Sequence, residues 1–355
     1  MQNCNIMSNI KEYQNSQQLI KNLSGKSKFV ITKNSKAIGL SRQTYQNKLE
    51  YLRDQKIITN FTININPNIR PNNLKYVMLE IKTNPKEPEL VEDLLNIPQL
   101  RMFDGIIGDF SLFALFIFKS PEEYYQTLNA IDKIMAKSYF KKYQIIETIR
   151  VFKTSGISLI KSRRRVEDQL NGKLIEEKDH LHDNSIIEFP EKTFLASELD
   201  DLDYNILKIL RDCQGFKPIS TYEIRKIFNE RFQIEISQST IHNRIKKLET
   251  EDIILNYAVN FNPKKIGFKG KYLLRIKPKD PSKYNEFAFR LTMKNNITDL
   301  FRIGEQYGLF AIVRVREIED YATFIKELYS TEEIEDTYTN FVLDELISYT
   351  NFIIA

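Results

Sequence analysis

The chain contains two similar segments at a fixed spacing of 196 residues (237 − 41). Ser41–Pro67 reads SRQTYQNKLEYLRDQKIITNFTININP, and Ser237–Pro263 reads SQSTIHNRIKKLETEDIILNYAVNFNP; the two align without a gap. Ten of these 27 positions are identical, where composition alone predicts about one or two. We infer a tandem duplication. The working unit is then a pair of similar modules in one polypeptide.

The second copy predicts three short helices followed by a strand. Leu199–Leu210 has an apolar stripe and acidic residues in its first turn, and Ser220–Phe228 opens with a Ser/Thr cap. Ser237 caps a third helix that runs to about Leu248, and the alternating segment Ile253–Phe261 predicts a strand or wing. This order is typical of a winged helix-turn-helix.

The third helix presents a polar and basic face in both copies. Ile241, Ile245 and Leu248 recur at helical spacing and are expected in the core, as are Tyr45, Leu49 and Leu52 of the first copy. The remaining side chains suit base edges or, for lysine and Arg244, phosphates. The alternative is an ordinary solvated face. The candidate DNA-binding residues are Gln238, Ser239, Thr240, His242, Asn243, Arg244, Lys246 and Lys247, with Arg42, Gln43, Thr44, Gln46, Asn47 and Lys48 in the first copy.

Each copy continues with a strand–helix–strand–strand–helix–strand pattern, the order of a ferredoxin-like domain. The predicted strands of the first copy are Lys75–Ile81, Leu100–Ile107, Leu112–Phe118 and Ile145–Phe152, with helices near Pro88–Leu95 and Pro121–Met135. Those of the second are Lys271–Ile276, Ile297–Ile303, Leu309–Val315 and Thr337–Leu343, with helices near Ser282–Met293 and Ile318–Tyr329.

The predicted fold class is therefore α+β, with two winged helix-turn-helix modules that are each followed by a ferredoxin-like domain. The expected boundaries are 1–66 and 67–154 for the first copy, 155–197 for a charged linker, and 198–262 and 263–355 for the second copy. The linker carries Arg163–Arg165, His180 and His182. We interpret it as a solvated tether, as charge runs of this kind usually are, and a contact of Arg163–Arg165 with a phosphate backbone is the alternative. The two histidines have no further metal ligands nearby, so we expect no metal site there.

Composition sets broad limits on function. The 355-residue chain has a net charge of +5 and a pI near 8.8, which permits nucleic-acid binding without requiring it. No apolar run has the length of a membrane span, and Met1–Leu23 is too polar for a signal peptide. Cys4 and Cys213 lack a metal-ligand spacing. We expect a cytoplasmic protein with no membrane partner, no metal and no cofactor.

The LDDLDYNIL opening, the STIHNRIKKLE helix, Asn262–Pro263, Gly267 and the turn IGEQYGLFAI resemble the Lrp/AsnC (feast/famine) family of bacterial and archaeal transcription regulators. The resemblance covers Leu199–Ala355 well. The first copy is more diverged, because it lacks the Leu-Asp opening and ITKNSKAIGL is a poor second helix. The resemblance implies double-stranded DNA as partner and RAM-type sheet domains that pair, here either within the chain or in a homo-oligomer.

The resemblance also implies small-molecule effectors near a glycine turn between paired domains. It marks two candidate loops, Gly304, Glu305, Gln306 and Tyr307 in the second copy and Gly108, Asp109 and Phe110 in the first. The family often has Tyr-Asp after this glycine, whereas the pairs here are Phe110–Ser111 and Tyr307–Gly308. An ordinary tight turn is the alternative.

The leading hypothesis is a sequence-specific transcription regulator built as a covalent pseudo-dimer, and not an enzyme. One alternative is an architectural DNA-binding or assembly protein in which only the second half reads DNA. A more remote one is a tetrapyrrole-processing enzyme, since some proteins that resemble this family act on tetrapyrroles. Against it, neither predicted sheet domain contains a histidine, and no nucleophile–base pair or phosphate loop is evident.

Overall fold

The computed structural model describes residues 17–24, 31–68, 74–162, 187–188, 199–347 and 350–354. The chain forms two compact units. One contains Met1–Arg70, Ala196–Phe268 and Ser348–Ala355, and the other contains Pro71–Leu195 and Lys269–Ile347. The predicted modules are contiguous in sequence, whereas each unit brings together the like parts of both copies. The candidate linker residues Arg163–Arg165, His180 and His182 lie outside the described residues.

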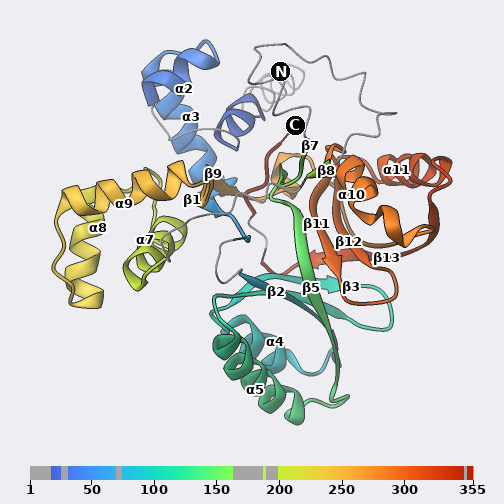
Figure 1. Ribbon diagram of the computed structural model, residues 1–355. Helices are drawn as coiled ribbons and strands as arrows, with labels where there is room; N and C mark the ends of the chain where they lie inside the picture. Colours follow the sequence, from blue (N-terminus) through green and yellow to red (C-terminus); the bar gives the residue numbers. More distant parts are fainter. Residues whose placement is uncertain are drawn as a thin grey trace, which may run out of the picture. The chain divides into compact units, whose positions relative to one another are not determined.

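In the first unit, the second copy forms the predicted winged helix-turn-helix (Figure 1). Its elements are α7 (Asp201–Asp212), α8 (Thr221–Ile227), the π-helical turn η2 (Phe228–Phe232), α9 (Gln238–Thr250) and β9 (Ile254–Phe261). Asp200 and Ser220 form capping boxes that begin α7 and α8. Ser237 caps α9, as predicted, by accepting a hydrogen bond from the backbone of Thr240.

The first copy forms a helix at residues 17–23, then α2 (Ile31–Ala37), α3 (Arg42–Asp54) and β1 (Ile58–Ile65). The expectation that ITKNSKAIGL makes a poor second helix is wrong. The reason is a Schellman end at Gly39, whose φ is +68°: Gly39 N donates to Lys36 O, and Leu40 N donates to Ser35 O. This ending satisfies the last carbonyls of α2 and places Ser41 to cap α3.

The core of the first module is completed by the second copy. Strand β1 pairs with β9 in an antiparallel two-stranded sheet. Val259 and Phe261 of β9 lie in the core cluster of the first copy, as do Phe352 and Ile354 of the chain end. Backbone hydrogen bonds between Phe261 and Thr350, at 2.7 and 2.9 Å, fix this C-terminal segment along β9. Residues of the second copy and of the C-terminal segment therefore complete the core of the first module.

The second unit contains the eight predicted main strands, grouped in two halves. The first half has β2 (Lys75–Lys82), α4 (Pro88–Leu95), β3 (Leu100–Ile106), β4 (Leu112–Phe118), α5 (Pro121–Lys137) and β5 (Lys142–Thr154). The second half has β10 (Gly270–Pro278), η4 (Pro281–Lys283), α10 (Tyr284–Thr292), β11 (Ile297–Ile303), β12 (Leu309–Val315), α11 (Ile318–Ser330) and β13 (Ile334–Glu345).

The two halves have the same internal strand order but do not form separate domains. The sheet order is β11-β12-β10-β13-β3-β4-β2-β5-β6, and β11 also pairs with β5, so eight strands close into one barrel. The sequence predicted two ferredoxin-like domains, and the structure has instead one barrel to which each half contributes four strands. The apolar runs LFALFIF and LFAIVRV are buried along almost their whole length, which requires cover on both faces. Closure supplies that cover and removes the free strand edges.

Helices cover the outside of this barrel, α4 and α5 on the first half and α10 and α11 on the second (Figure 1). A third apolar cluster, which includes Tyr76, Phe113, Phe301 and Phe310, fills the interior. Short strands β6 (Ile157–Ser158), β7 (Lys161–Ser162) and β8 (Ile187–Glu188) lie in the segment predicted to be a tether.

Candidate nucleic-acid interface

Helix α9 presents the predicted polar face. Ile241, Ile245 and Leu248 are buried, as expected from their spacing. The side chains opposite them are exposed: Gln238, Ser239, Thr240, His242, Asn243 and Lys246. Lys247 is half-buried. The hydroxyls of Ser239 and Thr240 each lie 2.8 Å from Ser237 Oγ, so these two groups are partly used in the helix cap.

Arg244 differs from the other candidates, because its guanidinium is bound within the protein. Its Nη1 lies 2.7 Å from Asp200 Oδ1 and 2.9 Å from Asp203 Oδ1, both in the first turn of α7. Although burial opposes it, the hydrogen bond from the Asp203 backbone and the Arg244 charge together lower the pKa of Asp200. In this structure the arginine ties the third helix to the capping box of the first, and its contact with a phosphate stays a prediction.

Helix α3 of the first copy presents a similar face. Tyr45 and Leu52 are buried, and Leu49 is half-buried. Arg42, Gln43, Thr44 and Asn47 are exposed, and Gln46 and Lys48 are half-buried. Gln43 Nε2 donates to Asn47 Oδ1 at 2.8 Å, while Thr44 is engaged with the Ser41 cap. Two of the candidate base-reading groups are thus bonded to each other in this structure.

Four asparagines join the two winged modules symmetrically. Asn60 and Asn64 of β1 correspond in the repeat to Asn256 and Asn260 of β9. Asn64 Nδ2 donates to Asn256 Oδ1 at 2.8 Å, and Asn260 Nδ2 donates to Asn60 Oδ1 at 3.0 Å. These four residues make up two of the ten repeated identities, yet nothing in the sequence analysis assigned them a role. The sequence sign of this role was that both asparagines, four residues apart on one face of the predicted strand, are the same in the two copies.

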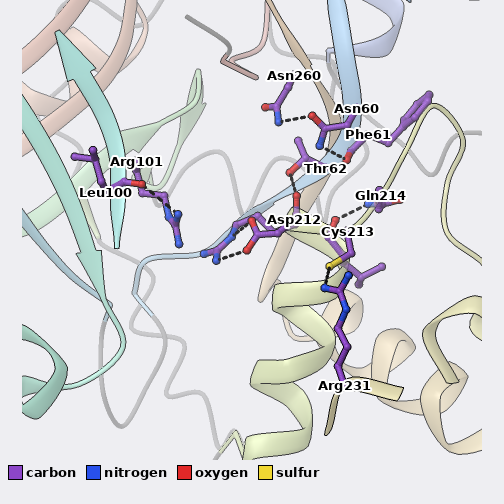
Figure 2. A network of polar contacts seen from close by, with 12 residues as sticks. Asn60, Phe61, Thr62, Leu100, Arg101, Asp212, Cys213, Gln214, Arg231 and Asn260 are labelled. Carbon is purple, nitrogen blue, oxygen red and sulfur yellow. Dashed lines mark hydrogen bonds and ion pairs between the residues drawn. The ribbon is translucent and has the colours of Figure 1, made fainter. Parts of the chain in front are cut away.

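Further contacts tie β1 to the end of α7, as Figure 2 shows. The Thr62 hydroxyl donates to the carbonyl of Arg211 at 2.9 Å, and Phe61 N donates to Gly215 O at 2.9 Å. Thr62 pairs with Ala258, its own equivalent in the repeat, so the local two-fold axis of the strand pair passes through these positions. Unit 1 therefore carries α3 and α9 on one jointly packed scaffold.

The two candidate effector loops lie in the barrel unit, and much of their polar surface contacts the protein itself. Glu305 Oε1 accepts a hydrogen bond from Arg275 Nε at 2.5 Å, and the Tyr307 hydroxyl donates to Asp336 at 3.2 Å. Gly304, Gln306, Gly108 and Asp109 are exposed, and Phe110 is half-buried. At Gly108, where φ is +151°, a Cβ atom would lie 2.9 Å from Asn340 Nδ2. The glycine is required by close contact between the halves.

Beneath these loops lies a buried ion pair that the sequence analysis missed. Arg275 Nη2 is 2.8 Å from Glu80 Oε2, and the two side chains are 4% and 5% exposed. Burial raises the pKa of the Glu80 carboxyl, and the Arg275 charge opposes this rise. Arg275 also lies 5.3 Å from the centroid of the Tyr338 ring. Each residue lies between two apolar neighbours in its strand, and only the pairing of the halves brings them together.

Within the described residues, no group of three or more histidine, cysteine or acidic side chains is placed to hold a metal ion. Among the same residues, no helix is long and apolar enough to cross a membrane. The exposed polar faces of α3 and α9 and the loops over the barrel are thus the candidate sites.

Comparison with known proteins bears on the second copy. Residues 272–352 match the model of the Lrp/AsnC ligand binding domain. The HTH-type transcriptional regulator FL11 of Pyrococcus furiosus is 31% identical over 145 residues, which cover 41% of this chain and 89% of that regulator. The chain belongs to the Lrp/AsnC family. The regulatory protein AsnC of Escherichia coli is 26% identical to this Lrp/AsnC chain over 153 residues, covering 43% of this chain and 95% of AsnC.

A solved structure resembles this Lrp/AsnC protein over nearly its full length. The siroheme decarboxylase NirDL matches with a TM-score of 0.54 and covers 94% of this chain and 91% of its own. The sequences are 10% identical, so the likeness concerns the fold alone. A second protein chain therefore has a similar fold over nearly its whole length.

Proposed function

We propose that the protein is a sequence-specific DNA-binding transcription regulator that acts as a covalent pseudo-dimer. The observation that carries this proposal is the exposed, acid-free face of α9, which projects from a winged helix-turn-helix in a chain whose relatives are HTH-type transcriptional regulators. Asn and Gln suit adenine edges, and lysines suit phosphates. Such a regulator works in the cytoplasm of a bacterial or archaeal cell, where the chromosome lies.

The paired modules support the pseudo-dimer. The β1–β9 sheet, whose strand β9 contributes to the core of the first module, holds two third helices in one unit, as two subunits do in dimeric regulators that address two half-sites. The strand pairings of β3 with β13 and of β5 with β11 join the two sheet halves of the same chain. In this proposal the duplication replaces a second subunit.

Substitutions on α9 separate the proposed roles. We expect Asn243→Ala to relax sequence preference, because it removes a base-edge contact of about 1–3 kcal/mol. Lys246→Ala should weaken binding to all sequences and reduce the salt slope by about one. Lys326→Ala, an exposed lysine on α11, is the control for a simple loss of charge. Binding is measured by fluorescence anisotropy on oligonucleotides selected by the protein, at several salt concentrations.

Equal losses on all sequences for Asn243→Ala and Lys246→Ala would contradict these assignments. Binding confined to α9, with no effect of Gln46→Ala or Asn47→Ala in α3, would favour the architectural alternative in which only the second half reads DNA.

The ion pairs of Arg244 predict an effect on the stability of the protein. Arg244→Ala should lower the free energy of unfolding by about 2 kcal/mol, less than for a fully buried pair, because Asp200 is half exposed.

We also propose, as a second function of the barrel unit, that the loops at Gly304–Tyr307 and Gly108–Phe110 respond to a small-molecule effector. The match to a ligand-binding domain over residues 272–352 supports this. A thermal-shift screen with free amino acids tests it. No stabilisation by any amino acid at millimolar concentration would leave these loops as turns that hold the halves together.

The likeness to a siroheme decarboxylase favours one competing function, an enzyme that acts on a tetrapyrrole. Visible absorbance of the purified protein, before and after addition of an iron porphyrin, distinguishes the two. A regulator should show no Soret band and no saturable binding. A stable one-to-one complex would instead support the enzyme.

A further inference from the structure

The two halves of the barrel correspond position by position. Glu80 of β2 pairs with Phe113 of β4, and Arg275 of β10 pairs with Phe310 of β12. Because β4 and β12 are the same strand of the two copies, Glu80 and Arg275 occupy equivalent positions. The equivalent phenylalanines, Phe113 and Phe310, stack with their ring centroids 5.3 Å apart. Equivalent residues thus meet each other inside the barrel.

At this meeting point the halves carry opposite charges. Glu80 and Arg275 form their ion pair with both side chains almost fully buried. Pairing two first halves would place one Glu80 against another, and pairing two second halves would place Arg275 against Arg275. Each of these arrangements buries like charges, which is unfavourable in a low-dielectric interior. Arg275 keeps the Glu305 carboxylate of its own half in either arrangement, but only the unlike combination gives Glu80 a cation.

Strands of different halves pair at two places, β3 with β13 and β5 with β11, which we call seams. The two seams carry different side chains at equivalent positions. At the seam of β3 with β13, Asp104 is opposite Glu345. The equivalent residues at the seam of β5 with β11 are Val151 and Phe301, which are also directly opposite. In the second half, Lys271 of β10 pairs with Arg314 of β12. The equivalent pair of the first half is Tyr76 of β2 with Ile117 of β4. One seam therefore buries four charged side chains where the other has four uncharged, largely apolar ones.

The charges at the polar seam come from both halves. Lys271 Nζ is 2.6 Å from Asp104 Oδ2, and Arg314 bonds both oxygens of Glu345 at 3.0 and 2.6 Å. Asp104 belongs to the first half and the other three to the second. If two first halves paired, Asp104 would face Val151, Tyr76 and Ile117 and would lose its cation. If two second halves paired, Lys271 would lose its Asp104 carboxylate.

We propose that the barrel interior is a selective interaction surface, on which each half accepts the unlike half and rejects a second copy of itself. By contrast, the β1–β9 sheet pairs asparagine with asparagine, so its repeated residues do not distinguish like from unlike partners. Selection thus resides in the barrel, at Glu80–Arg275 and at the polar seam. This inference concerns the fold and does not depend on DNA binding.

A charge exchange in the full-length chain tests the Glu80–Arg275 pair. Glu80→Arg and Arg275→Glu should each lower Tm by several degrees, because each places like charges together. The double exchange should recover part of this loss, because it restores the opposite charges but leaves the exchanged glutamate beside Glu305. Lys277→Glu, at the exposed Lys277–Glu335 pair of the same strand, is the control and should change Tm by less than about a degree or two. A double exchange as unstable as the single variants would overturn the proposal.

Co-expression of the two single variants tests selection itself. The Glu80→Arg chain repels its own second half, because the introduced arginine meets the native Arg275. The Arg275→Glu chain repels itself through Glu80. When the two are mixed, each first half finds an opposite charge on the other chain. By native mass spectrometry we expect a one-to-one heterodimer in the mixture and no dimer of either variant alone. Dimers of similar abundance in each variant alone, or none in the mixture, would contradict selection.

Discussion

The amino group of Lys153, in the barrel unit, donates hydrogen bonds to two backbone carbonyls. Its side chain is 4% exposed, and Nζ donates to the carbonyls of Thr292 and Lys294 at 2.8 and 2.9 Å, at the end of α10. Burial lowers the pKa of this lysine from its ordinary 10.5 to about 8, with the Asp299 charge opposing the change. A neutral amine still has the two N–H groups that these carbonyls require.

The lowered pKa predicts that stability rises with pH over this range. Between pH 8 and 10.5 the unfolded chain binds a proton at Lys153 that the folded protein has released, so raising the pH favours folding. The gain amounts to at most about 3 kcal/mol from the size of the pKa shift. Urea unfolding at intervals from about pH 7 to the upper end of this range measures it.

Lys153→Met is the comparison for this titration, because it removes the amine and keeps the side-chain length. The difference in unfolding free energy between the native protein and this variant should grow in favour of the native protein above pH 8. A difference that is independent of pH would mean that the amine keeps its ordinary pKa.

Residue types alone did not reveal which polar side chains are used internally. The stripe of α9 correctly placed Ile241, Ile245 and Leu248 in the core, because helical spacing fixes the buried face. The same spacing gives no information on Arg244, since its partners Asp200 and Asp203 lie about 40 residues away in sequence. Tertiary contacts of this kind decide whether a basic residue is available to DNA.

At the scale of elements, most strands and helices of the barrel lie where periodicity placed them. Leu112–Phe118, Ile297–Ile303 and Leu309–Val315 have the predicted bounds. The prediction of a poor helix at α2 was wrong because it depended on a weak apolar pattern. The informative residue is Gly39, whose left-handed conformation ends the helix. Closure of the barrel was not predictable from either copy alone, because strand edges meet only when both halves are present.

The C-terminal segment is predicted to stabilise the first winged module. Phe352 is 3% exposed and packs edge-on against Phe261 and Phe268, in a cluster with residues of the helix at 17–23. Phe352→Ala should lower the free energy of unfolding by about 3 kcal/mol. Hydrogen exchange of residues 17–23 should speed up with it.

Ile353→Ala is the neighbouring control, since Ile353 is only half-buried. Its effect on both measurements should be clearly smaller. If the two alanine variants behave alike, or if exchange at residues 17–23 is unchanged in Phe352→Ala, the segment does not complete this core.

For the whole molecule, the difference between α3 and α9 predicts an imperfectly palindromic operator. One face offers Arg42, Gln43, Gln46 and Asn47, and the other offers Gln238, Ser239, His242 and Asn243. Half-sites about one DNA turn apart would then differ in sequence. We expect selected oligonucleotides to be asymmetric, and a perfect palindrome of either half-site to bind about tenfold or more weakly, as one or more mismatches cost. Equal protection of both halves of a palindrome would count against this.

The two seams also change what a single mutation does. In a symmetric homodimer every substitution at the interface appears twice, so a poorly tolerated change is doubled, and a charge near the two-fold axis meets its own copy. Here each position at the seams exists once. Asp104 forms an ion pair with Lys271, whereas its equivalent in the other half is Phe301, so the two seams differ in their side chains. A chain of this design can therefore carry different side chains at equivalent positions of its two halves, as α3 and α9 do.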